Sequence, residues 1–357
     1  MMKEFLREDL RDFQPYQAND VEYLIKLDAN ESPFDLPDCV KKQLAFELMG
    51  KSDFNRYPDP GGRELRGAIA EACGVDREEV VLGNGSDELI QILVHAFINK
   101  GEVALCPVPS FVMYKICTQI GGGIAVEIPL DENFEYQMDA YYKAIEEYNP
   151  KMIFLCSPNN PTGNTLSEQE IIKLAEGYRG VIVVDEAYCE FSGGSLSKRI
   201  VRYPNIIVLR TFSKAMGLAG LRIGYLICNK DLALQINKVK PPYNLNRFSQ
   251  RAAVLMLKNQ DIIKERIRYI IKQREELYRQ LNGMAKVRTF PSQANFLLIQ
   301  VPDADRIAKR LLDEGILVRG FQRDSRLKDC LRITVGLEEE NRSFVRELRR
   351  ILKEERQ

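Results

Sequence analysis

The sequence predicts an α/β protein, with a mostly parallel central sheet in a large domain and a smaller α+β domain at its C-terminal end. Three short apolar runs, residues 152–156, 181–184 and 205–210, have the length and composition of buried strands. Helical patterns separate these runs along the chain. Strands that alternate with helices in this way are typical of a parallel sheet with helices on its faces.

We expect three parts along the 357 residues, a length that suits more than one hydrophobic core. They are an N-terminal arm that packs on the functional site and the small domain (1–29), a large domain (30–240) and an interdomain helix with the small C-terminal domain (241–357). Pro241 and Pro242 mark the exit from the large domain into a long helical stretch. After it, residues 293–300 and 330–335 have strand patterns with helices between them, which predicts the small domain.

Composition excludes several classes of protein. Lys plus Arg equals Asp plus Glu at 51 each, so no overall field favours nucleic acid or an anionic membrane. No apolar run approaches the length of a membrane span and no signal-peptide pattern opens the chain, so we expect a cytoplasmic protein. The eight cysteines form no C-x-x-C pair and a single histidine, His95, could join them, so we expect reduced thiols and no metal site. His95 lies in an apolar helical pattern, and we expect it to pack in the core.

A first functional motif is the segment G-N-G-S-D-E at residues 83–88, which follows a strand pattern. The N–H groups of Ser86 and Asp87 would open a helix, whose positive end favours a phosphate. The motif lacks the third glycine of a dinucleotide fingerprint, so we reject that interpretation. A simple helix N-cap by Ser86 or Asp87 is the structural alternative, and it is compatible with anion binding.

Two further motifs place polar side chains after strand patterns. Residues 157–163, S-P-N-N-P-T-G, form a turn made rigid by two prolines, which would present Asn160 to a ligand; a plain loop is the alternative. Asp185 ends the apolar run at 181–184, and a buried carboxylate needs a partner such as the N–H of a protonated ring. Capping of the next helix by Asp185 is the alternative. Tyr188 would reach the same ligand.

The fourth motif, at residues 211–225, sets Lys214 in a loop of small residues between Ser213 and Arg222. Its glycines let the backbone pass close to a bulky ligand. A lysine at the carboxyl end of a strand can condense with an aldehyde if partial burial and nearby positive charge favour its neutral form. Arg222 could hold a phosphate. An ordinary surface lysine is the alternative, which the other three motifs argue against.

Together, N-P-T-G at 160–163, D-E-A-Y at 185–188 and S-K with its arginine at 213–222 resemble the fold-type I pyridoxal-phosphate aminotransferases over nearly the whole chain. The resemblance implies that Lys214 is the Schiff-base lysine and that Asp185 pairs with the pyridine nitrogen. The other contacts that it implies are Tyr188 and Asn160 on the ring hydroxyl, Tyr114 stacked over the ring, and Ser86, Asp87, Ser213 and Arg222 on the phosphate. A tyrosine that merely fills the core is the alternative for Tyr114.

Other segments are similar to the histidinol-phosphate aminotransferases within that family. They are D-A-N-E-S-P at 28–33, N-R-Y-P-D at 55–59, K-P-P-Y-N at 240–244 and L-R-I-T-V-G at 331–336. This resemblance implies that Tyr57 reaches the partner's cofactor phosphate across a homodimer interface, that Arg319 and Arg332 bind the anionic end of the substrate, and that Tyr16 in the arm closes the pocket. The chain departs from the usual pattern at Ser32 and at Gly320 with Phe321, which puts substrate detail in doubt.

The resemblance implies transamination of L-histidinol phosphate with 2-oxoglutarate, giving imidazole acetol phosphate and L-glutamate in histidine biosynthesis. An aromatic or broad-range amino-acid aminotransferase stays open, as does a threonine-phosphate decarboxylase. A non-catalytic binding protein on the same fold is disfavoured, because Lys214 and Asp185 are both present.

Overall fold

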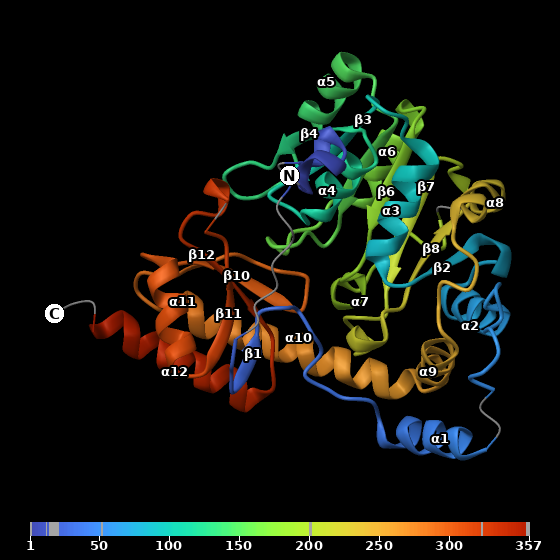
Figure 1. Cartoon of the computed structure of the whole chain (residues 1–357). Helices are drawn as coiled ribbons and strands as arrows, with labels where there is room; N and C mark the ends of the chain where they lie inside the picture. Colours follow the sequence, from blue (N-terminus) through green and yellow to red (C-terminus); the bar gives the residue numbers. More distant parts are fainter. Residues whose placement is uncertain are drawn as a thin grey trace.

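The computed structural model of the chain describes residues 2–11, 13, 21–50, 53–199, 202–322 and 324–354. Tyr16 lies outside these ranges, so its predicted place over the pocket stays a prediction. The strands within the described ranges form two sheets, one of seven strands and one of five. Figure 1 shows the seven-stranded sheet in green, yellow and cyan, beside the smaller sheet in orange and blue.

The seven-stranded sheet is the centre of the large domain and confirms the predicted parallel arrangement. Its strands in spatial order are β2 (Val80–Gly83), β8 (Gly224–Cys228), β7 (Ile206–Thr211), β6 (Val181–Asp185), β5 (Met152–Cys156), β3 (Val103–Val108) and β4 (Ile124–Pro129). Only β8 runs antiparallel to its neighbours. The ends of β5, β6 and β7 therefore meet at one edge of the sheet.

Helices cover both faces of this sheet, because its strands carry apolar side chains on both sides. In β5, Ile153 and Leu155 enter one apolar core, whereas Met152, Phe154 and Cys156 enter the other. The helices of the first core are α1 (Asp38–Met49), α2 (Arg63–Cys73), α5 (Met138–Tyr148), α6 (Glu168–Gly177) and α9 (Arg247–Lys258). Those of the second core are α3 (Ser86–Phe97), α4 (Met113–Ile120) and α8 (Lys230–Val239).

The five-stranded sheet forms the small domain. Its strands in spatial order are β1 (Ile25–Leu27), β11 (Ile316–Gly320), β12 (Cys330–Thr334), β10 (Phe296–Gln300) and β9 (Arg288–Thr289). Only β1 pairs in parallel, with β11, so the end of the predicted N-terminal arm completes the small sheet. Its core includes apolar residues of α10 (Gln260–Asn282), α11 (Ala304–Asp313) and α12 (Glu338–Glu354).

Helix α10 connects the two domains (Figure 1). The predicted boundary at residue 240 stays a prediction, and α9 beyond it still packs on the large domain through Leu255. None of the helices in the described ranges is long and apolar enough to span a bilayer. Among these residues, no group of His, Cys, Asp or Glu could hold a metal ion.

The prediction that His95 packs in the core is wrong. Its side chain is exposed near the end of α3, because the buried face of that helix is formed by Leu89, Ile90 and Leu93. His95 follows apolar residues at helical spacing, but it lies outside the face of the helix that is buried. Cys39 is also exposed, whereas the other seven cysteines are buried as free thiols.

Candidate active site

The candidate site lies where three parallel strands of the large sheet end. Asp185 is the last residue of β6, Lys214 follows β7 by three residues, and Asn160 lies in the loop after β5. Neighbouring strands β5, β6 and β7 pair in parallel register, which brings these loops to the same edge. Open α/β sheets bind ligands at such an edge.

Asp185 is a buried acid with two hydrogen bonds, and its side chain is only 3% exposed. The Tyr114 hydroxyl donates to Oδ2 at 2.7 Å and the Ala187 N–H donates to Oδ1 at 3.0 Å. Desolvation by burial raises the pKa of Asp185 to about 6, and it outweighs the opposing effect of these donors. Such a carboxylate is strongly stabilised by a cationic N–H partner.

The pKa of Lys214 is shifted downward, whereas that of Asp185 is shifted upward. Burial, followed by the positive charge of Arg332, lowers the pKa of its amine to about 8. Its Nζ donates to the carbonyl oxygen of Ala29 at 3.0 Å and lies 5.9 Å from the centroid of the Tyr188 ring. A neutral amine is therefore accessible near neutral pH, as condensation with an aldehyde requires.

Tyr188 and Asn160 lie beside this pair. The Tyr188 hydroxyl accepts a hydrogen bond from Asn30 Nδ2 at 3.0 Å, and burial raises the pKa of the phenol. Asn160 Oδ1 accepts from Arg332 Nη1 at 2.5 Å, which links the large domain to β12 of the small domain. That Tyr188 and Asn160 contact one ligand stays a prediction.

Arg319 and Arg332 are directly opposite each other on β11 and β12. Cross-strand partners of an antiparallel pair project from the same face of the sheet, with their Cβ atoms about 4.5–5.5 Å apart. Arg332 is 8% exposed, and its guanidinium also contacts the carbonyl oxygen of Asp28. Two guanidinium groups on one face can both donate to one doubly charged group.

The start of α3 has the properties of a phosphate site. Gly85 has a φ of +82°, and a Cβ there would lie 2.7 Å from Arg222 Nη2. A Cβ at Gly224 would lie 2.5 Å from the backbone nitrogen of Ser86, so only glycine permits this approach. Arg222 donates to Asp87 Oδ2 at 2.8 Å. Backbone N–H groups and a guanidinium therefore converge at the helix start, where they fit a phosphate monoester.

Ser213, also predicted to bind the phosphate, is buried immediately before Lys214. Its N–H donates to Thr211 Oγ1 within the same loop at 3.1 Å. This places Ser213 at the strand end, but its described hydrogen bond does not reach α3.

The predicted stacking of Tyr114 on the cofactor ring does not fit the geometry. The Tyr114 side chain is 1% exposed, its ring stacks on Phe154 with centroids 4.9 Å apart, and its hydroxyl is bonded to Asp185. Phe111, which is half-buried and packs edge-on against Tyr114 at 5.6 Å, retains exposed surface. Phe111 was not among the residues predicted from sequence, although it lies only three residues before Tyr114.

Two asparagines were also missed. Asn159 is fully buried and ties two loops together: it accepts from Ser110 and donates to the Pro109 carbonyl and to Thr162. Asn30 is 1% exposed and contacts both domains. In the sequence, Asn159 is only a polar residue in a Pro-rich turn, and Asn30 is only a polar residue next to an acid. Neither pattern specifies which residue the side chain contacts.

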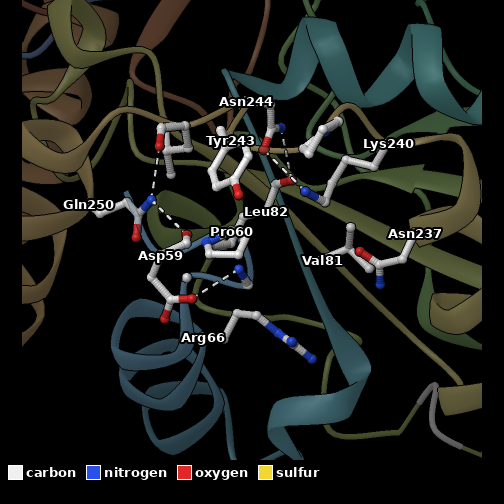
Figure 2. Close-up of a pocket in the computed structure, with 14 residues that line it drawn as sticks. Asp59, Pro60, Arg66, Val81, Leu82, Asn237, Lys240, Tyr243, Asn244 and Gln250 are labelled. Carbon is white, nitrogen blue, oxygen red and sulfur yellow. Dashed lines mark hydrogen bonds between the residues drawn. The ribbon is translucent and has the colours of Figure 1, made fainter. Parts of the chain in front are cut away.

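Tyr57 lies at the surface, with 77% of its surface exposed. Its ring stacks on Tyr243 at 4.5 Å, and its carbonyl oxygen accepts from Arg247. Tyr243 also lines a separate cavity of about 290 Å³ (Figure 2). The residues drawn there include Asp59, Arg66 and Lys240 but neither Lys214 nor Asp185, so this cavity is distinct from the candidate site.

Comparison with known proteins places the chain in a family. The sequence model for "Aminotransferase class I and II" matches residues 22–348. The chain is 44% identical over 352 residues to a histidinol-phosphate aminotransferase of Caldanaerobacter subterraneus subsp. tengcongensis, covering 99% of this chain and 100% of the relative. It is 43% identical to the enzyme of that name from a Thermoanaerobacter species, with the same coverage.

A solved structure agrees with these sequence relatives. The histidinol-phosphate aminotransferase from Sinorhizobium meliloti, in complex with pyridoxal-5'-phosphate, superposes with a TM-score of 0.85 at 26% identity, covering 93% of this chain and 92% of that one. The chain therefore belongs to the class I and II aminotransferases and, within them, to the histidinol-phosphate aminotransferase family.

Proposed function

We propose that this chain catalyses the pyridoxal-phosphate-dependent transamination of L-histidinol phosphate with 2-oxoglutarate, giving imidazole acetol phosphate and L-glutamate in histidine biosynthesis. The observation that carries the proposal is a buried lysine and a buried acid at adjacent strand ends, with Arg332 beside them. The pKa of Lys214 is lowered and the pKa of Asp185 is raised. Full-length identity of 42–44% to three histidinol-phosphate aminotransferases favours this reaction over the other aminotransferases and the decarboxylase.

The residues present fit pyridoxal 5'-phosphate. The proposed contacts are Lys214 with the aldehyde carbon, Asp185 with the ring nitrogen, Tyr188 and Asn160 with the ring oxygen, Phe111 with the ring face, and Ser86, Asp87, Ser213 and Arg222 with the phosphate. When bound, the cofactor supplies an electron sink for the carbanion that forms at the substrate α-carbon.

Three residues of the chain move or hold protons in this proposal. Lys214 Nζ takes the proton from the substrate α-carbon, which its lowered pKa permits because much of the amine is neutral near pH 8. Asp185 holds the proton on the ring nitrogen, since a carboxylate in a dry site gains most from a cationic partner. Tyr188 donates its hydroxyl hydrogen to the ring oxygen.

The arginine pair binds the substrate phosphate in this proposal. Arg319 and Arg332 project from the same face of the small sheet, so one dianion can accept from both guanidinium groups. Arg332 also contacts Asn160, so the phosphate end of the substrate would lie beside the proposed ring-binding residues. Arg332 would serve the carboxylate of 2-oxoglutarate in the second half of the reaction.

We further propose a cytoplasmic homodimer with shared active sites. Helix α1 and the loop after it expose Phe46, Met49 and Phe54 at 74%, 81% and 57%, next to the exposed Tyr57. Phe46, Met49 and Phe54 line one surface hollow, and exposed apolar groups that lie together favour association. Tyr57 would then reach the partner's cofactor phosphate, while Tyr16 would close the pocket. Seven buried free thiols agree with a reducing compartment.

Parallel assays test the proposed reaction. Cofactor-loaded protein is offered histidinol phosphate, phenylalanine and threonine phosphate, each with 2-oxoglutarate, and glutamate and carbon dioxide are measured. We expect the highest kcat/KM for glutamate formation with histidinol phosphate. A higher kcat/KM with phenylalanine, or carbon dioxide released from threonine phosphate, would contradict the proposal.

A further inference from the structure

Asn30 occupies a position that few residues tolerate. It lies after β1, is 1% exposed, and has a φ of +53°, in the left-handed region. Asparagine enters this region more readily than other residues with a side chain. The backbone therefore explains why an asparagine or a glycine is suitable here, but it does not explain the contacts of the amide.

Those contacts join Asn30 to three other parts of the chain. The Asn30 N–H donates to Thr334 Oγ1 at 2.9 Å, and the Thr334 hydroxyl donates to Asn30 Oδ1 at 3.3 Å. Asn295 Nδ2 donates to the Asn30 carbonyl oxygen at 3.0 Å. Asn30 Nδ2 donates to the Tyr188 hydroxyl at 3.0 Å. Thr334 and Asn295 belong to the small domain, whereas Tyr188 belongs to the large one.

The two preceding carbonyl groups face the same site. Ala29 accepts from Lys214 Nζ at 3.0 Å, and Asp28 accepts from the guanidinium of Arg332. The left-handed turn at Asn30 follows both groups directly. Residues 28–30 thus lie between the lysine of the large domain and the arginine of the small domain.

The direction of the Asn30–Tyr188 hydrogen bond has a chemical consequence. A phenol has one hydrogen to donate and oxygen lone pairs that accept. Thr334 fixes the amide orientation, because its hydroxyl donates to Oδ1 and so turns Nδ2 toward Tyr188. Since the amide N–H occupies a lone pair of the Tyr188 oxygen, the hydroxyl hydrogen stays available to another acceptor.

We propose that Asn30 is a positioning residue, which orients the Tyr188 hydroxyl hydrogen toward the ring oxygen of the cofactor and ties that orientation to Thr334 of the small domain. The inference rests on the proposed function, in which Tyr188 donates to that oxygen. It assigns to Asn30 an effect on the cofactor that acts through Tyr188 and not through direct contact.

The test measures the pH midpoint of the visible absorbance of the bound cofactor, which reports the proton on its linkage to Lys214. A donor on the ring oxygen opposes retention of that proton, so loss of the donor raises the midpoint. Asn30→Asp keeps the size and the left-handed preference of the side chain but replaces a donor with an acceptor, which would draw the Tyr188 hydrogen away. We expect a rise of about one pH unit, the size of a hydrogen bond to a charged group.

The new charge at residue 30 would also raise the midpoint, so the measurement is repeated in Tyr188→Phe. The other charged or titratable groups that act on Tyr188, namely Lys214, Arg332, Asp185 and Cys156, are the same in both backgrounds. Action through the hydroxyl predicts a larger shift for Asn30→Asp when Tyr188 is present. Equal shifts in the two backgrounds would overturn the inference.

Tyr188→Phe alone separates this inference from the proposed function. If that change leaves the midpoint unaltered, the proposed role of Tyr188 fails. If it raises the midpoint but Asn30→Asp does not, only the role of Asn30 fails. Asn149→Asp is the matched control, because Asn149 is an exposed asparagine with a φ of +45°, and it should leave the midpoint unchanged.

A second variant covers the case in which Asn30→Asp does not fold. Thr334→Val keeps the shape of the side chain and removes the hydroxyl that fixes the amide, so the amide can reverse. We expect a smaller rise of the midpoint, again present with Tyr188 and absent in Tyr188→Phe. An unchanged midpoint in Thr334→Val would contradict the orienting role.

Discussion

Replacement of Asp185 by Asn should stabilise the cofactor-free protein while it impairs the loaded enzyme. Asp185 is 3% exposed, and burial raises its pKa from the ordinary 3.8 to about 6. Because the folded state holds the proton more tightly than the unfolded state, the wild-type protein loses stability as the pH rises from about 4 through 6. The rise in pKa corresponds to about 3 kcal/mol at pH 7. Asn carries no charge and avoids this cost.

Urea unfolding of the cofactor-free proteins at pH 4 to 8 measures the effect. The free energy of unfolding of Asp185→Asn should exceed that of the wild type by an amount that grows from near zero at pH 4 to about 3 kcal/mol above pH 6. Asp313→Asn, at an exposed acid of α11, is the control and should show no such growth. A difference that does not depend on pH, or a less stable Asp185→Asn at pH 7, would refute the reasoning.

In the cofactor-loaded enzyme, Asp185→Asn should be less active than the wild type. A carboxylate stabilises the protonated ring nitrogen and an amide does not, so Asp185→Asn should lose about 2–5 kcal/mol of transition-state stabilisation, roughly 30-fold or more in kcat/KM. Unchanged turnover would show that Asp185 does not contact the ring nitrogen.

The remaining predictions concern the lysine, the arginines and the proposed dimer. Recombination of the cofactor-free protein with pyridoxal phosphate should accelerate as the pH rises through about 8, where Lys214 becomes neutral, and then level off; continued acceleration toward pH 10.5 would contradict the lowered pKa. Arg332→Ala and Arg319→Ala should each cost about 2–5 kcal/mol in kcat/KM for histidinol phosphate, and together less than the sum. Arg319→Ala should affect 2-oxoglutarate much less, and equal losses toward both substrates would exclude a role in phosphate selection. Mixing inactive Lys214→Ala with inactive Tyr57→Ala should restore about a quarter of the activity if subunits pair at random, whereas an active monomer in sedimentation would refute shared sites.

Runs and spacings of apolar residues predicted the parts of the fold that depend on residues close together in the sequence. The apolar runs of β5, β6 and β7 set the strand ends, and therefore the places of Asp185 and Lys214. The order of motifs then predicted the edge at which they meet. We expected the N-terminal arm to pack on the small domain, but not that β1 would pair with β11 as a strand. The two segments lie nearly three hundred residues apart, and no local signal reports such pairing.

The directions of side chains could not be predicted from the sequence either. Tyr114 and Phe111 are three residues apart in an aromatic segment, and the pattern does not specify which ring is buried against Phe154. Likewise, the sequence identified Arg319 and Arg332 but not their cross-strand register, which depends on how β11 and β12 pair. The contacts of Asn30 require both domains to be in place, so no window of sequence reveals them.

The half-reaction without an amino acceptor tests the central claim most directly. Cofactor-loaded protein is mixed with excess histidinol phosphate and no 2-oxo acid, while the visible absorbance and the phosphorylated keto product are followed. The proposed transamination predicts one equivalent of keto product per subunit, loss of the visible absorbance, and recovery of both absorbance and turnover when 2-oxoglutarate is added. No keto product, or product that accumulates beyond one equivalent without an acceptor, would contradict it.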